Sequence, residues 1–292
     1  LGRVGVYASH AGGAAFGGAD LVVVVGTPLD FRLGYGVFGG RDGATPATVV
    51  HVADSPGQLS LHANPAVATA GDLGAVLDAL TEAVQGREKA DATHAAALEL
   101  LRASADPIHP ARIYGELLPR LAQDAVVIGD GGDFVSFAGK FIEPARPGNW
   151  LDPGPFGCLG AGLGAAIAAR IARPSSQVVL LLGDGAAGFS LIDVDTLVRH
   201  RLPVVMVMGN NAAWGLEKGP MQMLYGYDVI ADLAPRTRYD EVVRALGGAG
   251  EMVTDPEQIG PALDRAFASG VPYLVNVVTD VEAGYPRATF GV

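Results

Sequence analysis

Residues 178–211, VVLLLGDGAAGFSLIDVDTLVRHRLPVVMVMGNN, decide the fold of this chain. Residues 178–182 and 204–208 are apolar runs of strand length, typical of parallel strands that are buried on both faces. Between the two runs, four apolar residues recur at helical spacing: Leu191, Val194, Leu197 and Val198. We therefore predict a strand, a helix and a second strand parallel to the first, with both carboxyl ends at one crevice.

Each predicted strand ends in residues that suit a metal-bound diphosphate. Gly183-Asp184-Gly185 follows the first strand, and Asn210-Asn211 follows the second. A carboxylate, an amide oxygen and a backbone carbonyl are hard ligands that Mg²⁺ or Ca²⁺ accepts, with phosphate oxygens and water at the remaining positions. The small side chains of Gly185, Ala186 and Ala187 let backbone N–H groups at the start of the following helix approach the phosphates.

The alternative is that both turns are ordinary strand ends of an α/β domain. Gly-Asp-Gly alone is common turn chemistry and carries little information. The pairing of this tripeptide with Asn-Asn, each directly after its own strand, favours the diphosphate site.

A nicotinamide site is a second alternative, at residues 160–164 (Gly-Ala-Gly-Leu-Gly). The spacing differs from G-x-G-x-x-G, and Asp152-Pro-Gly-Pro-Phe precedes it in place of a clean strand. These glycines are better explained by close helix packing and by approach of the backbone to a ligand.

The two turns resemble the signature of the thiamine diphosphate (ThDP)-dependent decarboxylase and carboligase family. The surrounding stretches look most like acetolactate synthase-like proteins: Asp130-Gly-Gly132, Gly154-Pro-Phe-Gly-Cys-Leu-Gly160 and Trp214-Gly-Leu-Glu-Lys218. The resemblance extends through residues 106–292 as a diphosphate-binding domain. It implies that Asp184 and Asn211 bind Mg²⁺ through their side chains and that Ala213 binds it through its carbonyl.

The resemblance also implies which residues contact ThDP. They are Gly131, Gly132, Leu159, Gly183, Asp184, Gly185, Ala186, Ala187, Asn211, Trp214, Gly215 and Leu216. Leu159 falls where the family places a large apolar side chain under the cofactor, with plain core packing as the alternative. Trp214, Glu217 and Lys218 either line the pocket or form a packed indole and a solvated ion pair. The segment after Asn211 is expected to run over the cofactor and to be partly mobile.

Two positions depart from the acetolactate synthase pattern. Asp133 stands where a Gln typically contacts the diphosphate, and its charge would repel phosphate unless it faces away or binds something else. Gly219-Pro220 stands where these enzymes usually have the Gln-Trp that shapes preference for the acceptor keto acid. The resemblance is therefore a poor guide to the substrate.

The expected fold class is α/β with doubly wound parallel sheets. Residues 1–85 are expected to form part of a Rossmann-like central domain, with strands at 21–25, 48–52 and 67–69 and a helix at 72–84. Residues 86–107 are expected to form a helical linker, and residues 108–292 the ThDP diphosphate-binding domain. Because the chain begins at Leu1 and its first strands lack partners, we expect it to be a portion of a longer polypeptide.

The second domain is expected to alternate helices and strands. Helices are expected at 111–122, 159–171, 189–200, 239–247 and 256–268, and strands at 125–129, 178–182, 204–208 and 273–278. In the first domain, the resemblance allows FAD or ADP as a further cofactor, contacted by Arg32 and Asp72. Against this, Ala53 replaces a carboxylate that would meet the ribose.

Composition excludes several classes of protein. The 292 residues are 49% hydrophobic with a mean hydropathy of +0.30, which is ample for buried cores. A net charge of −11 argues against a nucleic-acid partner. No apolar run reaches the roughly 18–20 residues that span a bilayer, and the start lacks the layout of a secretory signal, so we expect no membrane partner and a cytoplasmic location. The lone Cys158 and six histidines show no metal-ligand spacing.

The resemblance implies a ThDP- and Mg²⁺-dependent lyase or carboligase acting on 2-keto acids such as pyruvate. The Glu that activates ThDP belongs to a pyrimidine-binding domain absent from this sequence, so no catalytic residue is assigned and this chain alone is expected to be inactive. We expect a homodimer or homotetramer in which another subunit supplies that domain. The alternatives are a 2-hydroxyacyl-CoA lyase or oxalyl-CoA decarboxylase type of enzyme and a non-catalytic paralogue of the fold.

Overall fold

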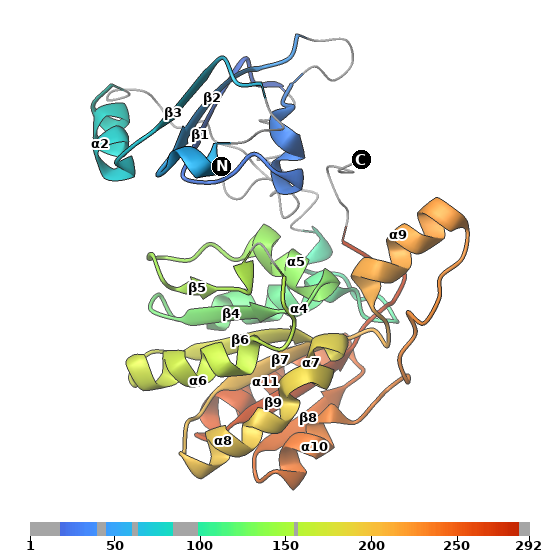
Figure 1. Ribbon diagram of the computed structural model, residues 1–292. Helices are drawn as coiled ribbons and strands as arrows, with labels where there is room; N and C mark the ends of the chain where they lie inside the picture. Colours follow the sequence, from blue (N-terminus) through green and yellow to red (C-terminus); the bar gives the residue numbers. More distant parts are fainter. Residues whose placement is uncertain (1–17, 40–44, 60–63, 84–98, 155–156, 286–292) are drawn as a thin grey trace. The chain divides into compact units, whose positions relative to one another are not determined.

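The computed structural model describes residues 18–39, 45–59, 64–83, 99–154 and 157–285 (Figure 1). The chain divides into two compact units, Leu1–His94 with Pro286–Val292, and Ala95–Tyr285. Residues 84–98, which include most of the expected linker helix, lie outside the described residues. In the described part of the chain, no helix is both long enough and apolar enough to cross a membrane.

The first unit contains a parallel sheet of three strands in the order β1-β2-β3. They are β1 (Leu21–Val25), β2 (Thr48–Ala53) and β3 (Val67–Ala70), which confirms the three predicted strands. The helix α2 (Leu73–Ala83) and the short 3₁₀ helices η2 (Phe31–Gly36) and η4 (Pro56–Gln58) complete the described elements. A small apolar core lies under one face of the sheet: Val22, Val24, Leu29, Phe38 and Val49.

The second unit contains a six-stranded parallel sheet in the order β5-β4-β6-β7-β9-β8. Its strands are β4 (Val126–Asp130), β5 (Trp150–Leu151), β6 (Val178–Gly183), β7 (Val205–Asn210), β8 (Ala249–Val253) and β9 (Tyr273–Val278). The pairing of β6 with β7 is parallel and sets Gly183 opposite Gly209. The predicted strand-helix-strand unit is therefore confirmed, and both of its strands end at the same edge of the sheet.

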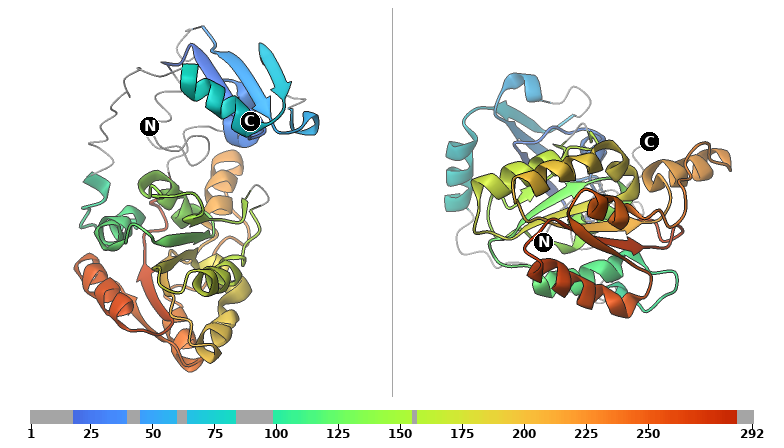
Figure 2. Two further views of the ribbon diagram at one scale, coloured as in Figure 1. Left: turned by 90° about the vertical axis from the view of Figure 1, so that its left-hand side faces the viewer. Right: turned by 90° about the horizontal axis from the view of Figure 1, so that it is seen from below.

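Helices cover both faces of this sheet (Figures 1 and 2). On one face lie α4 (Pro110–Leu117), α5 (Asp133–Phe141) and α11 (Ile259–Ala268); on the other lie α6 (Gly162–Ala172), α7 (Asp184–Ser190), α8 (Val194–Arg199) and α10 (Tyr239–Ala245). The side chains of β6 point alternately to the two faces of the sheet. Leu181 packs in the core under the first helix layer, and Leu180 and Leu182 pack in the core under the second. Each such buried Leu stabilises the fold by about 1.5–3 kcal/mol relative to exposure.

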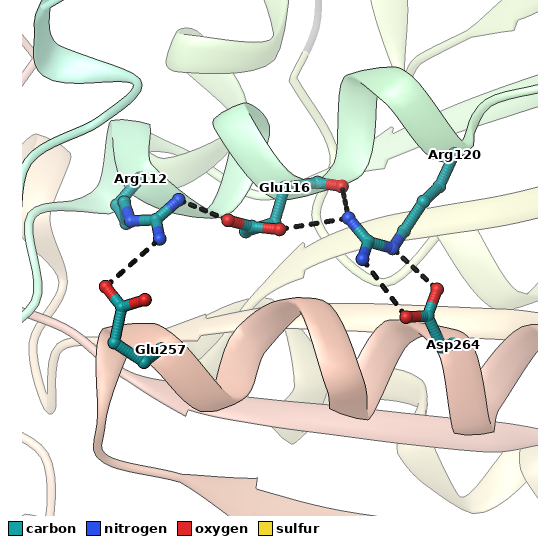
Figure 3. A network of polar contacts seen from close by, with 5 residues as sticks. All are labelled: Arg112, Glu116, Arg120, Glu257 and Asp264. Atoms are coloured by element: carbon teal, nitrogen blue, oxygen red, sulfur yellow. Dashed lines mark hydrogen bonds and ion pairs between the residues drawn. The ribbon is translucent and has the colours of Figure 1, made fainter.

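Ion pairs join the first helix layer along its outer side (Figure 3). Glu116 on α4 accepts from Arg112, one turn before it, and from Arg120, one turn after it at 2.9 Å. Arg120 then reaches Asp264 on α11 at 2.7 Å, and Arg112 reaches Glu257 at 3.4 Å. The network holds α4 and α11 in register, although exposed pairs of this kind contribute only about 0.2–1 kcal/mol each.

Several predicted boundaries were wrong. The expected helix at 159–171 begins at Gly162, and the expected helix at 189–200 is divided into α7, a 3₁₀ turn (Leu191–Asp193) and α8. The strands β5 and β8 and the helix α5 were not predicted. The segment after Asn211, expected to be a partly mobile run, contains the regular helix α9 (Gly215–Tyr225), with Pro220 inside it.

Candidate metal and diphosphate site

Two of the predicted turns pack against each other at backbone distance. Gly131 follows β4 and has a φ of 138°, a conformation that residues with a side chain rarely adopt. A Cβ at Gly131 would lie 2.9 Å from the backbone nitrogen of Gly183 at the end of β6. Among the described residues nothing lies within 4 Å of a Cβ built at Gly183. The glycines therefore bring the two strand ends together and leave open space beside Gly183.

The third turn, which follows β7, packs against the other two turns. A Cβ at Gly132 would lie 2.7 Å from the side chain of Leu216, and a Cβ at Gly185 would lie 2.7 Å from the ring of Trp214. Leu216 and Trp214 belong to the start of α9. The carboxyl ends of β4, β6 and β7 thus meet at one place, where the predicted cofactor residues are gathered.

Asp184 has a buried carboxylate at the meeting point of these strand ends, with 3% of its surface exposed. Its Oδ2 accepts a hydrogen bond from the N–H of Ala212 at 2.8 Å, and its Oδ1 accepts one from the N–H of Gly185 at 3.1 Å. The bond to Ala212 fixes the carboxylate beside the turn that contains Asn211. Burial raises the pKa of Asp184 to about 6, while the backbone N–H bonds lower it.

Asn211 and Ala213 form the opposite side of the same turn. The Oδ1 of Asn211 accepts from the N–H of Ala213 at 3.1 Å. Ala213 is bridged antiparallel to the segment 231–233, and the two hydrogen bonds of that bridge are made by the C=O of Ala212 and the N–H of Trp214. Because Ala213 is the non-bonded member of this ladder, its own N–H and C=O point away from residues 231–233. They point to the side on which Asn211 Oδ1 lies.

These three donors fit a divalent cation. The carboxylate of Asp184, the amide oxygen of Asn211 and the carbonyl of Ala213 are all hard oxygen ligands, contributed by two turns that a hydrogen bond holds together. Over the described residues, no group of three or more His, Cys, Asp or Glu side chains could hold a metal ion. The predicted set has one carboxylate and two neutral oxygens, which suits an ion that also binds phosphate oxygens.

Asp130 organises the turn before α6. It is buried, and its two carboxylate oxygens accept from the N–H groups of Gly160 at 2.9 Å and Gly162 at 2.8 Å. Burial raises the pKa of Asp130, and the bonds from Gly162 and Gly160 oppose that shift. Because Asp130 binds the N–H groups of Gly160 and Gly162, residues 159–161 form a turn, and α6 begins at Gly162 and not at the predicted Leu159.

Leu159 lies in that turn and is half-buried. Its neighbour Gly160 has a φ of 88°, and a Cβ there would lie 2.7 Å from the Cβ of Phe189 on α7. The turn therefore packs on the helix that begins with Asp184. The placement agrees with a role of Leu159 beside the cofactor, which stays a prediction.

Aromatic rings border the site at the start of α9. Trp214 is half-buried, and its ring meets that of Phe189 edge to face with 6.0 Å between centroids. Phe189 itself is 63% exposed.

The two predicted cofactor-binding alanines of α7 are buried. The side chain of Ala187 belongs to the apolar core, so only its backbone could contact a ligand. Ala186 is buried beside Gly131.

Two charged positions have structural partners. Asp133, the departure from Gln noted above, accepts from the backbone N–H of Tyr285 at 2.9 Å. Lys218 forms ion pairs with Asp232 and, at 3.9 Å, with Asp228, while Glu217 is exposed. The ion-pair alternative for Lys218 is the one that the structure shows.

In the first unit, Asp72 accepts from the N–H of Ala75 at 3.0 Å and so caps the start of α2. This role explains the residue without a nucleotide. Arg32 lies in η2, and its side chain lies outside the described residues.

A buried polar network behind the predicted metal-binding turn was not predicted from the sequence. It joins Asn210 at the end of β7 to Asn276 on β9, Asp240 on α10 and Arg238 before it. Asn276 is flanked by Val275 and Val277, so it reads as one polar residue in an apolar strand. That exception to the apolar pattern was the available signal.

Comparisons with known proteins identify the family of this chain. Residues 130–277 match the family model described as "Thiamine pyrophosphate enzyme, C-terminal TPP binding domain", and residues 1–80 match "Thiamine pyrophosphate enzyme, central domain". The chain is 54% identical over 289 residues to the acetolactate synthase large subunit IlvG of Mycobacterium tuberculosis, covering 96% of the chain and 52% of that protein. It is 32% identical over 289 residues to the 2-hydroxyacyl-CoA lyase 2 of Homo sapiens, covering 91% and 44%.

A solved structure shares the fold. It is the ThDP-dependent 4-hydroxybenzoylformate decarboxylase of Rhodococcus jostii RHA1, with a TM-score of 0.71 and 23% identity, covering 92% of this chain and 50% of that one. The chain spans about half the length of the curated relatives it matches. By its two matched domains and the 54% identity, the chain belongs to the thiamine pyrophosphate enzyme family and is acetolactate synthase-like.

Proposed function

We propose that the full-length protein is a ThDP- and Mg²⁺-dependent carboligase that decarboxylates a 2-keto acid such as pyruvate and joins the remaining fragment to a second keto acid. The observation that supports the proposal is the hydrogen bond from Ala212 N–H to Asp184, which joins the two turns that carry the predicted metal ligands. Bound ThDP supplies the electron sink for the carbon–carbon bond that breaks.

The residues of this chain bind and orient in the proposed reaction. Asp184, Asn211 and Ala213 would hold Mg²⁺, which would supply positive charge for binding the diphosphate. Gly131 and Gly183 let the backbone approach the phosphates, and Leu159 supports the rings of the cofactor. Proton transfer at the cofactor is assigned to a Glu outside this sequence, so these residues alone are proposed to bind ThDP weakly and not to turn over.

We further propose that the full-length protein is a dimer or tetramer whose active sites are shared between subunits. The pyrimidine-binding domain that carries the activating Glu would come from a neighbouring subunit. Sedimentation of the active full-length protein tests this proposal, because a fully active monomer contradicts shared sites.

A second candidate is a 2-hydroxyacyl-CoA lyase type of enzyme. It is favoured by the similarity to relatives named 2-hydroxyacyl-CoA lyase 2, and by Gly219-Pro220, which replaces the Gln-Trp of typical acetolactate synthases. Such an enzyme cleaves a carbon–carbon bond beside a hydroxyl group and needs a surface that binds coenzyme A. Both candidates use the same metal and diphosphate site.

The test is incubation of the full-length protein with ThDP, Mg²⁺ and a panel of 2-keto acids and acyl-CoA thioesters. The carboligase predicts one CO₂ and one acetolactate from two pyruvate molecules, whereas the lyase predicts cleavage of a 2-hydroxyacyl-CoA. The Asp184→Ala variant is expected to lose either activity. Turnover that survives this variant, or that needs no ThDP, would refute the proposal.

A further inference from the structure

The strand-side end of the metal-binding turn is fixed by a side chain on another strand. Asn210, the last residue of β7, is 1% exposed, and its Nδ2 donates to the Oδ1 of Asn276 at 3.0 Å and to the carbonyl of Thr237 at 3.2 Å. Its own carbonyl accepts from the N–H of Thr279 at 2.9 Å. Asn210 is therefore held by both its side chain and its backbone, one residue before the predicted metal ligand Asn211.

Asn276 lies fully buried on β9, opposite Met208 in the register of the sheet. Its Nδ2 donates to the carbonyl of Thr237 at 3.0 Å and to Oδ1 of Asp240 at 3.2 Å. Asp240, also fully buried, is paired with Arg238 at 2.6 Å. The hydrogen bonds of Arg238 and Asn276 outweigh the effect of burial, which raises the pKa of Asp240, so that its pKa is lowered and it stays ionised.

These partners allow only one orientation of each amide. A carboxylate and a carbonyl can only accept, so the nitrogen of Asn276 must face Asp240 and Thr237 and its oxygen must face Asn210. The nitrogen of Asn210 must then face Oδ1 of Asn276 and the carbonyl of Thr237, because a reversed amide would place its oxygen against these two oxygens. The carbonyl of Thr237 and the carboxylate of Asp240 together determine the orientation of Asn276, and Asn276 with the same carbonyl determines the orientation of Asn210.

The fixed orientation leaves one polar atom without a partner. Within the described residues, Oδ1 of Asn210 is buried and accepts no hydrogen bond. An unsatisfied buried acceptor is unfavourable and calls for an explanation. Here the explanation is that the same amide anchors the end of β7. Because successive strand residues point to opposite sides, anchoring Asn210 toward α10 turns Asn211 to the other side of the strand. The N–H of Ala212, in the same turn, donates to Asp184.

Resting on the proposed function, we infer that Asn276 is a positioning residue for the metal: through Asn210 it holds the turn that carries Asn211 and Ala213 beside Asp184. Residues that orient metal ligands typically contribute about 10–100-fold to metal affinity. The inference concerns affinity for the ion, so it can be measured without turnover.

The test uses full-length protein saturated with ThDP, with Mn²⁺ as the probe and free Mn²⁺ measured by electron paramagnetic resonance. Asn276→Thr suits a strand but cannot span from Asn210 to Asp240, and it is expected to weaken Mn²⁺ binding about tenfold or more. Val275→Ala on the same strand, in the opposite core, is the matched control: it should lower Tm and leave the Mn²⁺ affinity unchanged. Affinity within twofold of the parent for Asn276→Thr, or an equal loss in Val275→Ala at equal Tm, would overturn the inference.

A second variant keeps the test decisive if Asn276→Thr does not fold. The double change Asn276→Asp and Asp240→Asn exchanges the acid and the amide, so that position 276 still accepts from Asn210 and position 240 now donates. This variant should bind Mn²⁺ at least threefold more tightly than Asn276→Asp alone, and equal weakness of the two would contradict the inference. If Asp184→Ala abolishes Mn²⁺ binding while the Asn276 variants do not alter it, this inference alone fails. If the parent protein binds no Mn²⁺ with ThDP, the proposed function fails with it.

Discussion

The carboxylate of Asp184, directly after β6, accepts a hydrogen bond at 2.8 Å from the N–H of Ala212, two residues after β7 ends. The two residues are 28 positions apart in the chain, yet one bond joins the turns of neighbouring parallel strands. This contact joins the two turns that carry the predicted metal ligands. The predictions below test that site and the structure that supports it.

Replacement of Gly131 by Ala should damage both folding and cofactor binding. The φ of 138° and the 2.9 Å approach to Gly183 leave no room for a Cβ, and such strain costs about 1–3 kcal/mol. We expect a lower free energy of unfolding in urea and weaker ThDP binding by calorimetry. Gly164→Ala is the control, because Gly164 lies in α6 with open space at its Cβ position; it should be neutral or stabilise by up to about 1 kcal/mol. Equal losses in both variants would contradict the packing described here.

Binding of ThDP with Mg²⁺ should change the fluorescence of Trp214. The chain contains two tryptophans, and only Trp214 lies at the site, in contact with Gly185; Trp150 packs beside Gly129 in the core. The Trp214→Phe variant should lose the response to the cofactor, and Trp150→Phe should keep it. A response that disappears with Trp150 would place the cofactor elsewhere.

Asp133 should contribute to stability and not to phosphate binding. It accepts from the N–H of Tyr285, whose ring packs edge to face on Phe137 with 5.1 Å between centroids. Asp133→Ala should lower the free energy of unfolding by about 1–2 kcal/mol, the value of a hydrogen bond to a charged group that is partly exposed. Asp133→Asn keeps an acceptor and should lose less. An increase in ThDP affinity above tenfold in Asp133→Asn would show instead that the carboxylate faces the diphosphate.

The pair of Glu251 and Arg265 should make a small contribution to stability that depends on pH. The guanidinium of Arg265 lowers the pKa of Glu251, burial raises it, and the hydroxyl of Tyr273 lowers it further. Because the folded pKa lies below the unfolded value, the contribution is complete above about pH 5 and is lost as pH falls through the folded pKa. Arg265 is 52% exposed, so screening limits the contribution to less than about 1 kcal/mol.

Urea unfolding of Glu251→Gln at pH 7 and pH 3 measures this contribution. The variant should be less stable than the parent at pH 7, and this difference should shrink at pH 3. Glu257→Gln is the control, because Glu257 is 66% exposed and 3.4 Å from its partner. A Glu251 effect that persists undiminished at pH 3 would assign it to packing.

The sequence predicted the four inner strands of the six-stranded sheet well because they are mostly apolar. The runs at 178–182 and 204–208 are buried on both faces, and nothing but a parallel strand in an α/β sheet accounts for them at that length. By contrast, β8 (Ala-Gly-Glu-Met-Val) and the two-residue β5 carry no apolar run, since they are the edge strands and bury less. The helix α9 was not predicted, and it contains a glycine and a proline at 219 and 220, residues that disfavour a helix interior.

The candidate site residues that directly follow strands could be predicted from the sequence. The hydrogen bonds between residues far apart in the sequence could not. Asp184 and Asn211 follow strands directly, so the approach of their two turns could be inferred from the parallel pairing alone. The partners of Asn210 lie 66 residues away on β9 and 27 residues away at Thr237, and no local pattern links them. The hydrogen bond of Asp133 to Tyr285 spans 152 residues and was equally hidden.

The most direct test of the central claim measures metal binding by the two turns together. Full-length protein with ThDP should bind Mn²⁺, detected by electron paramagnetic resonance, and Asp184→Asn and Asn211→Ala should each weaken that binding by about 100-fold or more, beyond the effect of residues that only orient ligands. The combined loss of Mn²⁺ affinity in the doubly substituted protein should be smaller than the product of the two single losses, because both residues serve one ion. Mn²⁺ binding that survives either substitution unchanged would contradict the shared site.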